Sequence, residues 1–293
     1  MSKRLIEVGP IYIRTMRKSD YPHAVELTSL MRWGNTERDF EWMSFFEPHG
    51  CFVAVDGSRL VGVATTIGYG GLGWIGNVIV SPEYRGMGVG SLLVDHAIEY
   101  FKARSTGSVG LYSYPENLRF YKRIGFVEDS SFVWLTCPQV RRGFPRADNP
   151  RFRRMERRDL KSVIDLDKDF FGADRSRVLT KIYSEFDELC WVSAYGKEVQ
   201  GYIMGTRSGY RIDIGPWAHG AEDGLNAITL LNTFLRRLAG TEANIGVQAG
   251  NLKARLIESG FIVKSHVIRM FLNGKKPPTR DDCLLAIESL ERG

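Results

Sequence analysis

Stretches in the two halves of this sequence repeat each other. IRTMRKSDYPHAVEL, from Ile13, aligns with FRRMERRDLKSVIDL, from Phe152, and CFVAVDGSRLVGVATT, from Cys51, aligns with CWVSAYGKEVQGYIMG, from Cys190, at the same offset of 139 residues. Further on, ENLRFYKRIGF aligns with GNLKARLIESGF at an offset of 135. Similarity that keeps its order over such distances indicates duplicated domains. The length of 293 residues also suits two domains of ordinary size.

Each copy predicts the same order of helices and strands. In the first copy, apolar residues at helical spacing over 19–31 predict a helix. The runs CFVAV and LVGVATT around Asp56-Gly57 predict a hairpin, and WIGNVIV at 74–80 predicts a buried strand. An amphipathic helix is expected from Ser91, followed by the strands GLYSY and FVWLTC. We therefore expect an α/β fold with two tandem copies, each a mixed, twisted sheet flanked by helices.

A glycine-rich turn joins the strand at 74–80 to the helix from Ser91. The first amides of a helix have no partners within the helix, and its dipole makes this end partly positive, so such a junction attracts anions. Gly86, Gly88 and Gly90 lack the side chain that would keep a phosphate away, and Arg85 adds a positive charge. The turn therefore predicts a site for a phosphate-bearing ligand; a tight turn without a ligand is the alternative.

The turn fits one phosphate-binding pattern better than the others. Its third glycine comes one residue too early for a dinucleotide-binding fold, and it lacks the Gly-Lys-Ser/Thr of a P-loop. It resembles the pyrophosphate loop of the GNAT superfamily of N-acetyltransferases, Arg/Gln-x-x-Gly-x-Gly/Ala, at Arg85, Gly88 and Gly90. FYKRIGF at 120–126 is similar to the Phe-Tyr-x-x-x-Gly-Phe element of that family. The resemblance covers residues 11–137 and extends more faintly to the second copy.

The resemblance implies acetyl-CoA as co-substrate, bound between two strands that splay apart. Pantetheine would pair with the open edge of the strand, and an amide near Val78 would hold the developing oxyanion. Tyr121 matches the residue that protonates the departing thiolate; core packing is the alternative. The implied cofactor-binding residues are Val78, Ile79, Val80, Arg85, Gly86, Met87, Gly88, Val89, Gly90, Ser91 and Asn117.

No base is evident in the sequence. An ammonium must lose a proton before it attacks, and many members of the family carry a carboxylate on the strand before the loop, where this chain has Gly76 and Asn77. Asn77 either orients a water or substrate group or satisfies only the backbone. Tyr112, Tyr114 and, from the second copy, Asp213 are further candidates for contact with substrate.

The second copy is expected to keep the fold without the cofactor. Its turn, WAHGAEDGLN, has Glu222 and Asp223 where a dianionic diphosphate would bind, and Leu256 stands in place of Tyr121. We expect this copy to pack against the first and to supply a wall of the substrate cleft through residues 210–217.

These expectations divide the chain into a catalytic domain at 1–140, a linker at 141–151 and a degenerate GNAT-like domain at 152–293. Eight arginines and two carboxylates between Arg141 and Arg158 carry a net +6, equal to the formal charge of the whole chain. A solvated linker and an anion site both remain open. The segment lacks the interleaved aromatics of a nucleic-acid module, which argues against a nucleic-acid partner.

Composition limits the class of protein further. No stretch approaches the roughly 18 apolar residues of a membrane helix, and the N-terminus lacks the apolar core of a signal peptide, so we expect a cytoplasmic protein with no membrane partner. The four cysteines lie far apart without metal-ligand spacing, so we expect reduced thiols and no metal site.

The leading hypothesis is transfer of an acetyl group from acetyl-CoA to a primary amine of a small molecule, by direct attack in a ternary complex. One alternative is an acetyltransferase for protein or peptide amines. Another is an acyl-CoA-binding regulator without turnover, which the missing carboxylate favours and Tyr121 disfavours. The sequence indicates neither the acceptor nor the oligomeric state.

Overall fold

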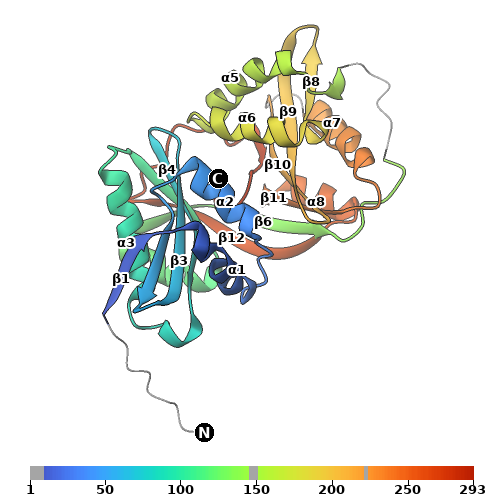
Figure 1. Cartoon of the computed structure of the whole chain (residues 1–293). Coiled ribbons are helices and arrows are strands. Elements are labelled where there is room, and N and C mark those ends of the chain that lie inside the picture. The colour runs from blue at the N-terminus through green and yellow to red at the C-terminus, as the bar shows by residue number, and fades with distance from the viewer. Residues whose placement is uncertain (1–9, 145–150, 221–223) are drawn as a thin grey trace.

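One continuous sheet runs through both halves of the chain. The computed structural model describes residues 10–144, 151–220 and 224–293. The sheet order is β1-β2-β3-β4-β5-β12-β6-β11-β10-β9-β8-β7, with β13 beside β10 (Figure 1). Its strands are β1 (Ile11–Thr15), β2 (Phe52–Asp56), β3 (Arg59–Gly68), β4 (Leu72–Val80), β5 (Ser108–Ser113), β6 (Phe126–Cys137), β7 (Phe152–Arg154), β8 (Trp191–Tyr195), β9 (Glu198–Ser208), β10 (Arg211–His219), β11 (Glu242–Gln248), β12 (Ile262–Leu272) and β13 (Leu284–Ala286).

The helices follow the same order in each half, which confirms the tandem α/β architecture expected from the repeat. Both halves begin with a strand and two helices, continue with three antiparallel strands, and place a long helix before the fifth strand. The helices are α1 (Tyr21–Ser29), α2 (Glu37–Phe46), α3 (Val89–Lys102) and α4 (Leu118–Ile124) in the first half, and α5 (Leu160–Phe171), α6 (Ser176–Glu185), α7 (Gly224–Arg237) and α8 (Asn251–Glu258) in the second.

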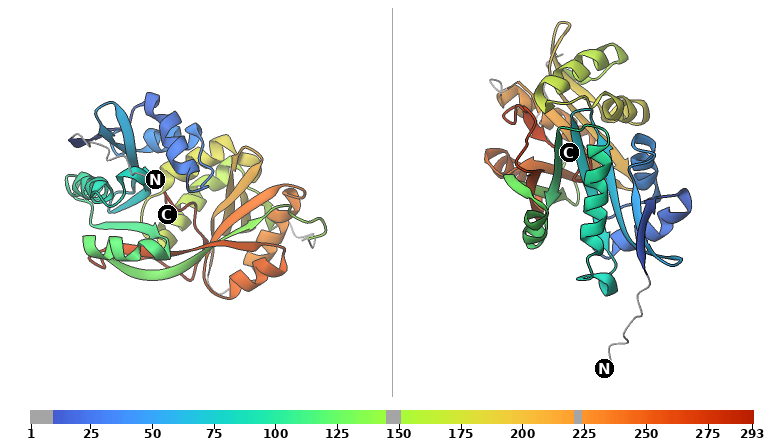
Figure 2. Two further views of the ribbon diagram at one scale, coloured as in Figure 1. Left: turned by 90° about the horizontal axis from the view of Figure 1, so that it is seen from below. Right: turned by 90° about the vertical axis from the view of Figure 1, so that its left-hand side faces the viewer.

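The two halves exchange their last long strands. β12 of the second half lies between β5 and β6, and β6 of the first half lies between β12 and β11 (Figure 2). Tyr112 of β5 is opposite Arg269 of β12, while Val133 of β6 is opposite both His266 and Val247. Each half therefore completes the sheet of the other. An isolated first half would leave β5 with an open edge and β6 with no neighbours.

Helices cover both faces of the first-half sheet. α3 packs on β2, β3 and β4 through Leu93, Ala97 and Phe101, which are fully buried. Gly73 of β4 makes room for this helix, because a Cβ at that position would lie 2.6 Å from the ring of Phe101. On the opposite face α1 and α2 lie against β3, with Phe40 of α2 fully buried. β3, at the centre of these contacts, is thus covered by helices on both faces.

The second half is fastened by a buried ion pair as well as by apolar packing. The Nη2 of Arg175 lies 2.6 Å from Asp167 Oδ1, and both side chains are almost completely buried. The hydroxyl of Tyr202 on β9 also donates to Asp167. Removing one member of such a pair leaves a buried charge without its partner, at a cost of about 3–5 kcal/mol.

The cysteines and the lengths of the helices also bear on the class of protein. The four cysteines are free and buried, as the spacing predicted. Within residues 10–144, 151–220 and 224–293, every helix is too short or too polar to cross a bilayer.

Candidate functional site

A wedge opens where β4 and β5 part. These parallel strands pair only from Leu72 to Ile75 on β4 and from Ser108 to Leu111 on β5. Beyond that point β4 continues to Val80 beside β3 but without β5 on its other side. This is the gap in which the resemblance places the cofactor.

A bulge in β4 shapes the wedge. The register between β3 and β4 shifts between Gly76 and Ile79, so that Asn77 and Val78 lie at the irregularity. Asn77 has a φ of +49°, a left-handed conformation that asparagine tolerates better than most residues. Its Nδ2 donates to Thr65 Oγ1 at 3.2 Å, which ties the bulge to the neighbouring strand. Bulges re-aim the backbone beside active sites, and this one turns β4 toward the wedge.

The glycine-rich turn follows β4 directly and ends at the start of α3. Gly86 and Gly88 have φ values of +81° and +83°, and nothing lies within 4 Å of the position that a Cβ would occupy on either. Gly88 is the N-cap of α3, which begins at Val89, two residues before the predicted start. The turn is thus an open cradle over the first amides of a 14-residue helix.

The rest of the turn is arranged around this cradle. Arg85 Nε donates to the carbonyl of Val80 at 3.0 Å, while the side chain remains exposed. Met87 is half exposed. A Cβ on Gly90 would lie 3.4 Å from Phe120, an ordinary van der Waals contact, so α4 packs directly beside this part of the turn.

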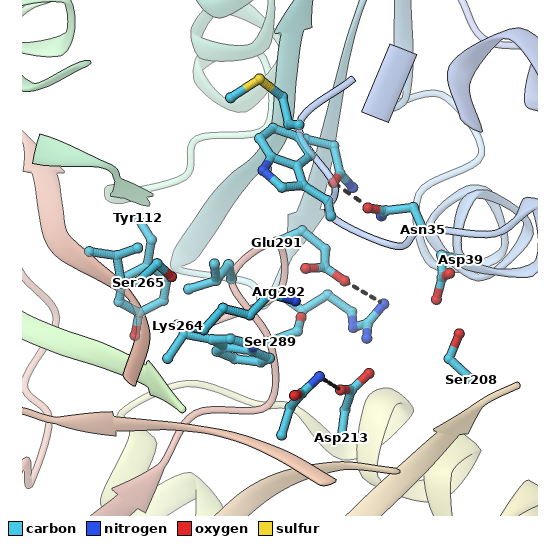
Figure 3. Close-up of a pocket in the computed structure, with 18 of the residues that line it drawn as sticks. Asn35, Asp39, Tyr112, Ser208, Asp213, Lys264, Ser265, Ser289, Glu291 and Arg292 are labelled. Atoms are coloured by element: carbon cyan, nitrogen blue, oxygen red, sulfur yellow. Dashed lines mark hydrogen bonds and ion pairs between the residues drawn. The ribbon is translucent and has the colours of Figure 1, made fainter. Parts of the chain in front are cut away.

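A cavity of about 730 Å³ lies between the two halves (Figure 3). Of the predicted site residues, Ile79 and Val80 and the turn at 85–91 lie outside its lining, toward the start of α3. The predicted residues that line it are Asn77, Val78, Tyr112, Tyr114, Asn117, Tyr121 and Asp213.

Tyr121 lies on α4 with 8% of its surface exposed. Its ring packs edge-on against Phe120 and Phe126, with centroid distances of 4.9 and 5.9 Å. A tyrosine is protonated at neutral pH, and burial raises the pKa of this hydroxyl further. Tyr121 therefore holds a proton that a strongly basic neighbour could take.

Aromatic side chains form the first-half wall of the cavity. Tyr112 packs against Trp74 and Phe132, and Tyr114 stacks on Trp33 with a centroid distance of 6.4 Å. Burial raises the pKa of both tyrosines. These rings offer flat, uncharged faces to a ligand, next to charged side chains of the same half such as Arg32 and Asp39.

The opposite wall is polar. Asp213 on β10 accepts a hydrogen bond from Asn244 Nδ2 at 2.9 Å and lies 3.0 Å from Arg211 Nε. Burial raises the pKa of Asp213, and the positive charge of Arg211 opposes that rise. Two buried atoms here, Asn244 Oδ1 and Ser289 Oγ, have no hydrogen-bond partner among the described residues. Because buried polar atoms are normally satisfied, these two atoms are available to hydrogen-bond water or a bound molecule.

The C-terminal tail enters the same cavity, which the sequence did not predict. Residues 289–292 line it, and Figure 3 shows Glu291 and Arg292 directed into it. Tyr69 donates to the carbonyl of Arg292 at 2.6 Å, and Trp74 Nε1 donates to that of Leu290 at 3.1 Å. The sequence of the tail has no hydrophobic periodicity from which its position in the fold could be predicted. The lining also contains Arg32, Asn35, Asp39, Lys264 and His266, which sequence reasoning missed as well.

In the second half, the tail closes the corresponding wedge. β10 and β11 also pair in parallel over four residues, but beyond them β13 pairs with Trp217 and Ala218, and the amide of Ile287 donates to Gly246 at 3.0 Å. The irregularity in β10 contains Pro216, which has no N–H to offer. Glu222 and Asp223 of the predicted turn lie outside the described residues. The second-half gap is thus filled by the protein itself.

The basic segment contributes ion pairs outside the cavity. Arg153 binds Asp159 at 2.6 Å, and Arg154 binds Asp187 at 2.7 Å. Residues 145–150, at the centre of the expected linker, lie outside the described residues. Among the described His, Cys, Asp and Glu side chains, no three group together in a way that could hold a metal ion.

Comparison with known families identifies both copies. Residues 13–126 match the acetyltransferase (GNAT) family, and residues 163–286 match an acetyltransferase (GNAT) domain. Each match contains a complete splayed strand pair. The chain belongs to the GNAT acetyltransferase family. This tandem GNAT protein thus carries two copies of the fold, and members of its family use acetyl-CoA.

Curated relatives resemble part of the tandem GNAT chain. An uncharacterized N-acetyltransferase of Methanocaldococcus jannaschii is 33% identical over 103 residues, 30% of this chain and 44% of its own length. The mycothiol acetyltransferase of an Arthrobacter species is 34% identical over 119 residues, 37% of this chain and 36% of its own. The tandem GNAT chain therefore spans less than half the length of these relatives.

Solved structures share the complete tandem fold. A putative acetyltransferase from Pyrococcus horikoshii superposes with a TM-score of 0.80 at 20% identity, over 100% of this chain and 99% of that one. A GCN5-related N-acetyltransferase from Sphaerobacter thermophilus gives a TM-score of 0.69 at 16% identity, over 92% and 98%. The arrangement of the two GNAT copies therefore occurs in other proteins.

Proposed function

We propose that this protein transfers an acetyl group from acetyl-CoA to a primary amine of a polar small molecule. The observation that carries the proposal is the open wedge between β4 and β5, whose two ends fit the reaction. One end is the cradle at Gly86 and Gly88, and the other is the cavity that contains Tyr121. Acetyl-CoA supplies the activated acetyl group when it is bound.

The turn at 85–91 would hold the diphosphate of the cofactor. The amides at the start of α3 point out of the helix, the dipole adds positive potential, and Arg85 is exposed beside them. The part of β4 that β5 leaves unpaired on one edge, including Val78 and Val80, would offer backbone groups to the pantetheine in the manner of an added strand. Asn117, exposed on the cavity rim, is placed to contact the same arm.

Three residues would act on the reacting groups. The Val78 amide at the bulge would stabilise the negative charge that develops on the acetyl oxygen. Tyr121, which is protonated at neutral pH, would give its proton to the departing sulfur. Asn77, tied by Thr65, fixes the bulge and so aims the amide. Each role uses a group that the fold already holds in place.

The second copy would shape the acceptor site without binding cofactor. Its wedge is occupied by β13, so one acetyl-CoA per chain is expected. Its wall of Asp213, Asn244 and Ser289 would hydrogen-bond a polar acceptor. A cavity of about 730 Å³ between two halves suits a small molecule better than a flat protein surface. The alternatives are a peptide amine that enters by its end and a regulator without turnover.

The test is release of free thiol from acetyl-CoA in the presence of panels of small amines and of peptides. The proposal expects release with polar primary amines and a binding stoichiometry of one. A preference for peptide amines would favour the first alternative. Tight binding of acetyl-CoA without release for any amine would contradict transfer and favour the regulator.

A further inference from the structure

The proposed reaction still needs a base, and the tail places a carboxylate where β4 has none. Gly76 lies on β4 at the edge of the wedge, and Glu291 packs directly on it. A Cβ on Gly76 would lie 2.5 Å from the Cα of Glu291 and closer still to its Cβ. The side chain of Glu291 therefore starts from the position at which a β4 side chain would begin.

The carboxylate of Glu291 is directed into the cavity. Figure 3 shows it between the first-half and second-half walls, with Asp39 on one side and Arg292 beside it. The tail that carries it is fixed by Tyr69 and Trp74, which bind the carbonyls of its neighbours. Glu291 is thus a cavity residue on a held segment.

The other carboxylates in the cavity lining have local partners or lie at its rim. Asp39 Oδ2 accepts from the Thr36 amide at 2.7 Å and from its hydroxyl at 2.8 Å, as a cap of α2. Asp213 is bound by Asn244 and Arg211, and Glu116 is exposed. Glu291 is enclosed and caps no helix. Like Asp213 it pairs with an arginine, but that arginine, Arg292, is shared with Glu288.

A single cation faces Glu291 from its own segment. Arg292 Nη1 lies 3.2 Å from Glu291 Oε1, while Nε and Nη2 of the same guanidinium are 2.5 and 2.9 Å from Glu288. Burial raises the pKa of Glu291; the charges of Glu288 and of Asp39 on α2 raise it further, and Arg292 opposes the rise. A carboxylate with a raised pKa accepts a proton from an ammonium more readily than an exposed one does.

We infer that Glu291 is the general base of this acetyltransferase, supplied by the C-terminal tail in place of a side chain on β4. This assignment rests on the proposed function, for which no general base has been named so far. Glu291 takes one proton from the substrate ammonium and passes it to solvent through the open cavity. The neutral nitrogen then forms the C–N bond as the C–S bond breaks. The second nitrogen proton passes to water, Tyr121 gives its own proton to the sulfur, and Tyr121 is then reprotonated from that water. The nitrogen thus loses two protons and the sulfur gains one, so one proton is released per acetyl group transferred.

The principal test is Glu291→Gln, which keeps the shape of the side chain and removes its basicity. The value of kcat/KM at neutral pH should fall by about 10²–10⁴-fold. Without the base, the variant should depend on amine that is already neutral, so its rate should climb about tenfold per pH unit while the native rate stays level. Glu258→Gln, on the exposed side of α8, is the matched control and should behave as the native protein.

Gly76→Ala tests the same arrangement from the other side. Its methyl group would push the tail away from β4, so activity should fall while Glu291 itself is unchanged. Gly71→Ala, with nothing within 4 Å of the new methyl group, is the control and should be fully active. Calorimetric binding of coenzyme A should be the same for all four variants, which separates loss of the base from loss of the cofactor site.

The outcomes distinguish this inference from the function on which it rests. If the native protein releases no thiol with any amine, the proposed function is wrong. If the native protein turns over and Glu291→Gln remains within threefold of it, only the base is wrong. A raised KM with unchanged kcat and no recovery at high pH would make Glu291 a counter-ion for the ammonium and would also overturn the inference. If His266→Gln lost activity while Glu291→Gln kept it, the general base would be His266 on β12 and the inference would be wrong.

Discussion

Replacing Gly88 with glutamate should weaken cofactor binding strongly through charge. Gly88 caps α3 and its missing Cβ faces open space, so the added side chain meets no obstacle in the protein itself. A carboxylate about 4 Å from a diphosphate, at an effective dielectric constant of about 20, costs about 4 kcal/mol, which corresponds to a roughly 10³-fold weaker complex. The measurement is calorimetric titration of each variant with coenzyme A.

Two control variants isolate this effect. Gly88→Gln carries the same backbone strain at a φ of +83°, about 1–2 kcal/mol, without the charge. Gly57→Glu puts a glutamate in another open, left-handed turn, between β2 and β3, and should bind coenzyme A normally. Added salt should narrow the difference between the two Gly88 variants, because it screens exposed charges. Equal affinity of Gly88→Glu and the native protein would refute the diphosphate site.

Three further changes test other parts of the account. Tyr121→Phe should lower kcat by about 10²-fold with unchanged coenzyme A affinity, and native turnover in this variant would exclude the acid role. Asn244→Leu should raise KM for a polar amine by about fivefold, the value of one hydrogen bond of about 1 kcal/mol, whereas an effect on kcat alone would contradict a binding role. A fragment of residues 1–140 should be insoluble or inactive because β12 is missing; size-exclusion chromatography and thiol release check this, and a soluble, fully active fragment would contradict it.

The parts of the fold that could be predicted from the sequence are those set by local patterns. The Asp56-Gly57 hairpin, the alternating and buried strands, and the glycines before α3 each follow from neighbouring residues. α2 is not among the predicted helices, although Phe40, Met43 and Phe46 have the spacing of one helix face.

The parts that could not be predicted depend on contacts between distant residues. β6 pairs with β11 and β12, more than a hundred residues away along the chain, and nothing in its own sequence chooses these partners over its own half. Glu291 was overlooked for the same reason. The strand β4 itself carries no carboxylate at Gly76. The missing side chain of Gly76 leaves the space that Glu291 of the tail occupies.

The most direct measurement is a crystal structure of the protein with coenzyme A. The account expects one molecule per chain, its diphosphate on the amides from Met87 to Ser91 and its sulfur beside Tyr121, with β13 still in place on β10. Coenzyme A between β10 and β11, or a turn at 85–91 that makes no contact with the diphosphate, would contradict the account.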